Sequence, residues 1–105
     1  MGSRPVRELI TNSLREDPEL AEEVYNEAVL CLVRGESEVT KILLRDLIHA
    51  TVGFEAMAVA LEKSPKSLYR MLSINGNPKL DNLSAILYQL ACLVKPGVVR
   101  EEETV

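Results

Sequence analysis

The segment from residue 63 to residue 79 combines basic side chains with hydrogen-bonding ones. It carries four Lys or Arg residues and no Asp or Glu, although the whole chain of 105 residues has a net charge of −4. Positive side chains attract the phosphates of nucleic acid, and Arg, Ser and Asn can also read base edges. We therefore expect this segment to bind double-stranded DNA. The candidate contacts are Lys63, Ser64, Lys66, Ser67, Tyr69, Arg70, Asn75, Asn77 and Lys79.

The expected contacts differ in what they can bind. Lys66, Ser67 and Arg70 stand at the start of a predicted helix, where backbone N–H groups are also available to a phosphate. Arg70 can pair with a guanine edge at two positions or hold a phosphate, and Ser67 can reach a base or a phosphate. Tyr69 is equally suited to the sugar-phosphate wall and to the core. Residues on either side of the helix would lie along the DNA backbone: Lys63, Asn75, Asn77 and Lys79.

The charge distribution leaves a second interpretation open. Residues 1–62 hold twelve acidic and six basic side chains, so the chain is an acidic body with one basic segment. Such a pattern favours a directional interaction. The alternative is that the four basic residues are simply part of a solvated helical surface.

Catalytic and metal-binding patterns are lacking in the sequence. His49 is the single histidine, and there is no Cys-x-x-Cys or His-Glu-x-x-His grouping to hold zinc. Gly76 lies in a predicted turn without a preceding strand, so it does not form a phosphate-binding glycine loop. The sequence predicts a protein that is not an enzyme and that needs no cofactor or metal.

Composition indicates one soluble, cytoplasmic domain. Hydrophobic residues make up 47% of the chain and charged residues 27%, the proportions of an ordinary globular protein. The apolar run at 28–33 is far shorter than the roughly 20 residues of a spanning helix, and no secretory leader opens the chain. Cys31 and Cys92 each sit in an apolar helical pattern, which predicts buried free thiols in a reducing compartment.

Hydrophobic periodicity predicts an all-α bundle of five or six helices. The expected helices cover about 4–17, 18–34, 36–50, 54–61, 65–73 and 79–94, with helix starts at Asp17-Pro18 and Ser64-Pro65. We expect residues 1–52 to be a helical extension packed on the core, residues 53–95 to be the DNA-binding part of the same domain, and residues 96–105 to be a flexible acidic tail. Positions expected to face the core include Leu9, Ile10, Leu14, Val39, Ile42, Leu47, Leu80 and Ile86.

A short helix, a tight turn, a capped second helix and a loop follow one another over residues 53–79. This order is typical of a helix-turn-helix, in which the second helix enters the major groove of DNA. The bundle is therefore expected to contain a helix-turn-helix of the lambda-repressor type.

The stretch KSPKSLYRMLSINGNPKLDNLSAIL closely resembles the helix-turn-helix of addiction-module antidote (antitoxin) proteins and of the phage-repressor (lambda repressor and Cro-like) regulators. The resemblance covers about residues 9–93. Two positions depart from the family pattern, because Glu62 stands where a turn glycine is usual and Lys63 where an apolar residue is usual. The matching positions are Ser64, Ser67, Leu68, Tyr69, Arg70 and Leu72 in the helix, and Gly76, Asn77 and Pro78 in the loop.

The resemblance implies a sequence-specific transcriptional regulator. The expected form is a homodimeric repressor, whose two-fold symmetry places half-sites about 34–36 Å apart. The resemblance further implies an antitoxin that binds a small basic RelE-like toxin, for which the acidic first two helices offer a complementary surface. The alternative is a protein-interaction module that no longer binds DNA, which Glu62 and the overall acidity favour.

Overall fold

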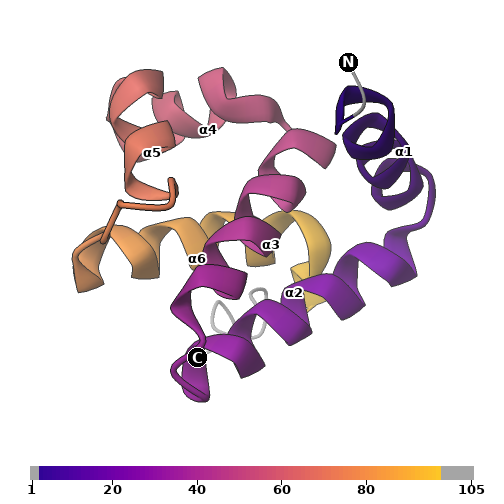
Figure 1. The fold of residues 1–105 in the computed structure, drawn as a ribbon, viewed down its shortest axis with the longest axis horizontal. Coiled ribbons are helices and arrows are strands. Elements are labelled where there is room, and N and C mark those ends of the chain that lie inside the picture. The colour runs from indigo at the N-terminus through magenta and orange to yellow at the C-terminus, as the bar shows by residue number, and fades with distance from the viewer. Residues whose placement is uncertain (1–2, 98–105) are drawn as a thin grey trace.

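The computed structural model describes residues 3–97, with side chains from residue 9 onward, and this part of the chain contains helices and no strands (Figure 1). The all-α prediction is confirmed at this level. No helix between residues 3 and 97 is long and apolar enough to cross a membrane. The acidic tail predicted at 96–105 falls outside the described residues from position 98 onward. The six helices are α1 (Ser3–Glu16), α2 (Pro18–Val33), α3 (Ser37–Ala50), α4 (Gly53–Leu61), α5 (Pro65–Met71) and α6 (Leu80–Val94).

The helix starts predicted from capping residues are confirmed. The Asp17 carboxylate accepts hydrogen bonds from the N–H groups of Glu19 and Leu20, both at 3.1 Å, and Pro18 follows as the first residue of α2. Such a cap satisfies N–H groups that the helix itself cannot pair. At the other end of α2, Gly35 adopts a φ of +83°, which reverses the chain toward α3.

The hydrophobic core joins five of the helices and centres on α3. Three residues of α3, Leu44, Leu47 and Ile48, are completely buried. α2 packs against α3 and α6, while α4 packs against α3, α5 and α6. The core therefore includes side chains from both parts of the chain, before and after residue 53. Its members are Ala21, Ala28, Leu44, Leu47, Ile48, Phe54, Met57, Ala58, Leu68, Leu72, Ile86 and Leu90.

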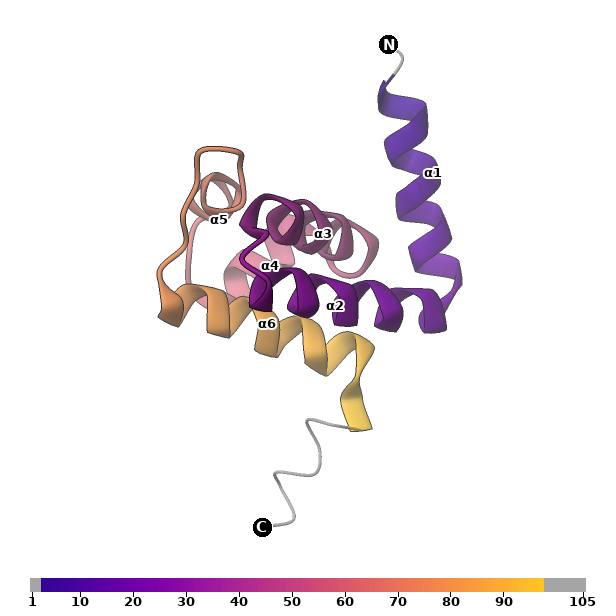
Figure 2. The same cartoon turned by 60° about the horizontal axis from the view of Figure 1, so that its bottom comes forward.

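α1 extends away from the rest of the molecule (Figure 2). Near its C-terminal end Leu14 is buried, and the Arg15 guanidinium donates a 2.9 Å hydrogen bond to the His49 carbonyl at the end of α3. The expectation that Leu9 and Ile10 face the core is wrong, since Leu9 is 67% exposed and Ile10 46%. Both side chains line a hollow between α1, α2 and α3 instead of packing in the core.

Three further core assignments are wrong, on α3 and α6. Val39 and Ile42 are exposed, because the face of α3 that carries them is not covered by α1, α2 or α4. Leu80, the first residue of α6, is 79% exposed. Conversely, the polar side chains of Thr40 and Lys41 are buried on α3.

Both cysteines are free thiols, but only one is buried. Cys31 is buried on α2, and its thiol donates a hydrogen bond to the Glu27 carboxylate at 3.7 Å. Burial, assisted by the carboxylates of Glu36 and Glu27, raises the pKa of the Cys31 thiol. Cys92 is half-buried on α6, so the prediction of a buried thiol is wrong there.

Candidate nucleic-acid interface

A three-residue connection, Glu62 to Ser64, links α4 to α5. Glu62 adopts the left-handed conformation with φ 57° and ψ 42°, and its N–H donates to the Val59 carbonyl at 3.1 Å. The Lys63 N–H donates to the Ala58 carbonyl at 2.9 Å, which completes a C-terminal cap usually made with glycine. The chain thus keeps the tight turn at the cost of a strained glutamate.

Ser64 begins α5 as an N-cap. Its hydroxyl oxygen accepts a 3.0 Å hydrogen bond from the Ser67 N–H, and its carbonyl accepts the Leu68 N–H at 3.0 Å. The backbone N–H groups at this helix start are expected to be available to a phosphate, but the cap already engages that of Ser67. The Ser64 hydroxyl proton stays available as a donor.

The two sides of α5 differ sharply in exposure and chemistry. Leu68 is completely buried on α5, as is Leu72 at its C-cap. Lys66 and Arg70 are exposed, and Ser67 is half-buried. α5 is two residues shorter than predicted, since Leu72 is already its C-cap; beyond it, the Ser73 hydroxyl donates to the Arg70 carbonyl at 2.8 Å.

Tyr69 both packs and remains accessible. Its ring lies against Phe54 of α4, with centroids 4.7 Å apart, and Phe54 in turn lies 4.9 Å from the His49 ring. The Tyr69 side chain is nevertheless 42% exposed. Tyr69 therefore packs against the core and also keeps an edge that is accessible to solvent.

The loop between α5 and α6 carries the remaining candidates, Asn75, Asn77 and Lys79, all exposed. The Gly76 N–H donates to the Ser73 carbonyl at 2.9 Å. A Cβ atom on Gly76 would overlap the carbonyl oxygens of Arg70 and Met71, so only glycine allows the loop to pack against the end of α5.

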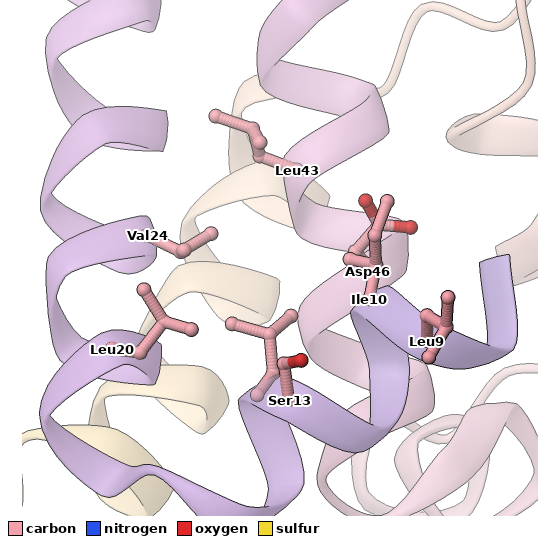
Figure 3. Close-up of a pocket in the computed structure, with 8 residues that line it drawn as sticks. Leu9, Ile10, Ser13, Leu20, Val24, Leu43 and Asp46 are labelled. Carbon is pink, nitrogen blue, oxygen red and sulfur yellow. The ribbon is translucent and has the colours of Figure 1, made fainter. Parts of the chain in front are cut away.

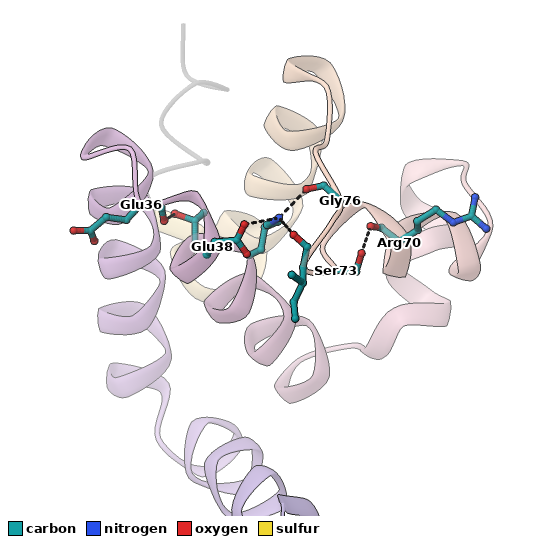
Figure 4. Close-up of polar contacts among 8 residues, drawn as sticks. Glu36, Glu38, Arg70, Ser73 and Gly76 are labelled. Carbon is teal, nitrogen blue, oxygen red and sulfur yellow. Dashed lines mark hydrogen bonds and ion pairs between the residues drawn. The ribbon is translucent and has the colours of Figure 1, made fainter.

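Lys41 of α3 holds this loop and was not among the predicted site residues. Its ammonium group donates to the carbonyls of Ile74 at 3.0 Å and Gly76 at 2.7 Å, and it forms an ion pair with Glu38 at 3.5 Å (Figure 4). A signal was present in the sequence, since Lys41 precedes Leu44 and Ile48 by three and seven positions and so shares their buried face.

The basic side chains of the segment have no acidic partner among residues 9–97. In the part of the chain that the structure describes, no salt bridge engages Lys63, Lys66, Arg70 or Lys79. Glu55 and Glu62 of the α4 region are exposed acids near the segment in sequence. The cationic groups are thus available to an external anion.

Two shallow hollows flank α5, and Arg70 lines both of them. Phe54, Lys66 and Tyr69 contribute to one hollow. The other is bordered by Ser67 together with loop residues 75–77. Figure 4 shows the Arg70 guanidinium extending away from Gly76. All nine predicted contacts therefore lie on α5 or on the two connections that flank it.

A third hollow has a different character and location. It lies between α1, α2 and α3 and is lined almost entirely by apolar side chains, with Ser13 and Asp46 at its border (Figure 3). Its apolar lining comes from Leu9, Ile10, Leu14, Leu20, Val24 and Leu43. No group of three or more His, Cys, Asp or Glu side chains that could hold a metal ion occurs among residues 9–97.

Comparison with protein-family models, with curated proteins and with solved structures found no match to this chain.

Proposed function

We propose that this protein is a sequence-specific, DNA-binding transcriptional regulator in which α4 and α5 act as a helix-turn-helix. The observation that carries the proposal is the two-sided chemistry of α5. Lys66 and Arg70 are exposed without acidic partners in the described chain, while Leu68 and Leu72 fix the opposite side of the helix in the core. A short helix held in this way can enter the major groove.

The proposed contacts divide into base readout and backbone positioning. Arg70 and Ser67 would read base edges, since they lie on the solvent side of α5. Lys63, Ser64 and Lys66 at the start of α5, together with Asn75, Asn77 and Lys79 after it, would contact phosphates. Tyr69 would contact the sugar-phosphate wall with its exposed edge.

The proposal includes a homodimer that acts as a cytoplasmic repressor. A seven-residue helix offers little contact area, so useful affinity requires two copies on a two-fold site. An antitoxin role follows from the resemblance of the segment 63–87. The exposed acids Glu19, Glu22 and Glu23 on α2 support it, because they offer a negative surface to a small basic toxin.

Duplex binding over a salt series tests the proposal. We expect the wild type to bind a random-sequence duplex, with an affinity that falls steeply with salt, and to select a preferred sequence from a randomised library. The double variant Lys66→Ala/Arg70→Ala should bind more weakly, with a salt slope reduced by about 1 because the lost Lys66 phosphate contact contributes about 0.9, and with a weaker sequence preference because Arg70 no longer reads a base.

Arg34→Ala/Lys95→Ala is the matched control. It removes the same number of positive charges from residues outside the segment 63–79, and it should leave the salt slope unchanged. Equal losses in the two double variants would mean that net charge, and not the α5 surface, drives binding. That result would contradict the proposed interface.

A protein-interaction module is the second candidate function. The apolar hollow between α1, α2 and α3, with Leu9 67% exposed at its border, favours it. The negative charge of Glu62, beside the basic segment, also weighs against phosphate binding. If the wild type binds no duplex DNA at low salt, this function replaces DNA binding as the proposal.

A further inference from the structure

We propose that Lys41 is a positioning residue that presents the backbone N–H groups of Asn75 and Asn77 to a DNA phosphate. The inference rests on the proposed function. It assigns part of the DNA contact to a residue of α3 that does not itself meet the nucleic acid.

The Lys41 ammonium is enclosed by protein. The residue is 7% exposed, and its three N–H donors match three acceptors: the carbonyls of Ile74 and Gly76 and the carboxylate of Glu38. A lysine held in this way has no donor left for an outside anion. Its effect on DNA must therefore pass through the loop.

The geometry of the peptide bond sets the direction of that effect. The described residues contain no cis peptide bond, and in a planar trans peptide the C=O and N–H groups point in opposite directions. The Ile74 carbonyl shares its peptide with the Asn75 N–H, and the Gly76 carbonyl shares its peptide with the Asn77 N–H. Because both carbonyls point to Lys41, both N–H groups point away from it.

The two N–H groups are directed toward the α5 side of the loop. Residues 75–77 separate two hollows: one is lined by Lys41, and the other by Ser67 and Arg70. Within the described chain, neither N–H donates to another backbone group. Donors that point away from the ammonium therefore lie on the side of Arg70, where a phosphate would approach. The ammonium also polarises both peptides, which strengthens their N–H groups as donors.

Few other contacts hold this loop. From Ser73 to Ala85 no residue is fully buried, and Ile74 is 73% exposed. The loop therefore has no apolar anchor of its own. The two carbonyl contacts of Lys41, together with the close packing of Gly76, fix the orientation of its peptides.

Inorganic phosphate titrated into the ¹⁵N-labelled full chain tests the inference without DNA. We expect the Asn75 and Asn77 amide resonances of the wild type to shift with phosphate, and the same resonances of Lys41→Met to stay unchanged. A loss of overall stability alone would not abolish these two shifts in a folded variant. If Lys41→Met fails to fold, the wild-type titration decides: an absence of both shifts overturns the inference.

The affinity of each variant for duplex DNA provides a second test. Lys41→Met should bind duplex at least about tenfold more weakly, because misplacing even one of the two N–H donors loses a hydrogen bond to a charged group. Its salt slope should equal that of the wild type, because neutral N–H donors release no counterions. Glu38→Gln is the control, since it leaves both carbonyl contacts in place and should bind within about twofold of the wild type.

The outcomes separate this inference from the proposed function. If Lys41→Met binds duplex as tightly as the wild type while Lys66→Ala/Arg70→Ala does not, the positioning role is wrong and the interface stands. A salt slope reduced by about 1 in Lys41→Met would instead indicate direct phosphate contact and overturn the positioning role. A wild type that binds no duplex overturns the proposed function and this inference together.

Discussion

The rings of Phe54 and Tyr69 lie against each other at the boundary between α4 and α5, with centroids 4.7 Å apart and planes inclined by 41°. This contact joins the buried Phe54 of α4 to the partly exposed Tyr69 of α5, whereas Leu68 of α5 is completely buried in the core. The orientation of α5 therefore depends on an aromatic pair that is itself partly accessible to solvent.

Replacement of Tyr69 separates its packing role from its binding role. Tyr69→Ala should lower the free energy of unfolding by about 1–2 kcal/mol, since an aromatic pair contributes about 0.5–1.5 kcal/mol beyond the buried area. Tyr69→Phe keeps the ring and should unfold at nearly the same urea concentration as the wild type. If Tyr69→Phe is as unstable as Tyr69→Ala, the hydroxyl and not the ring pair stabilises the junction.

Glu62→Gly should stabilise the protein. The left-handed conformation at Glu62 (φ 57°) costs a residue with a Cβ atom about 1 kcal/mol relative to glycine. Urea unfolding should therefore show a free energy of unfolding higher by about that amount.

Glu62→Gln is the control for charge, because it keeps the Cβ atom and removes the carboxylate. Its stability should match the wild type. The duplex affinity of both variants should rise, because each removes a negative charge beside the basic segment. An increase in stability in Glu62→Gln would show that charge repulsion, not backbone conformation, is the cost at this position.

Gly76→Ala should destabilise the loop between α5 and α6. The added methyl group would overlap the Arg70 and Met71 carbonyls, and such overpacking costs about 1–3 kcal/mol. Gly97→Ala is the matched control, since a Cβ atom there has no neighbour within 4 Å. Thermal unfolding of the two variants measures the difference, and equal midpoints would contradict the close packing of the loop.

Tyr25 links stability to pH. Its hydroxyl donates a 3.0 Å hydrogen bond to the Leu87 carbonyl, and burial, followed by the nearby Cys92 thiol, raises the pKa of the phenol. The folded protein therefore keeps this proton at a pH where the unfolded chain releases it. The contribution is fully present below the unfolded pKa of about 10 and is lost as the pH rises above it.

Tyr25→Phe tests this linkage. The variant should be less stable than the wild type by about 0.5–1.5 kcal/mol at pH 7, the net value of one hydrogen bond. As the pH rises above the unfolded value of about 10, the difference should shrink. Urea unfolding at several pH values gives the comparison, and a constant difference across the range would argue against a raised Tyr25 pKa.

The sequence predicts the helices well because local signals determine where they begin and end. Asp17-Pro18 and Ser64-Pro65 are starts that depend on neighbouring residues alone, and both occur as expected. The left-handed turn at Glu62 carries no such local signal, because a glutamate stands there in place of the usual glycine.

Exposure was harder to predict, because it depends on which helix faces are covered. Ile42 and Leu80 follow the apolar period of their helices, yet no neighbour covers them. Lys41 follows the same period on α3 and is buried, because the distant Ile74 and Gly76 carbonyls supply acceptors. A partner more than thirty positions away leaves no local trace in the sequence.

The two-sided character of α5 also separates folding from recognition. Leu68 and Leu72 hold the helix, whereas Lys66 and Arg70 contribute nothing to the buried interior. A library randomised at positions 66 and 70 should consequently retain mostly folded members. The same six-helix scaffold could then be reprogrammed toward other target sequences without redesigning its interior.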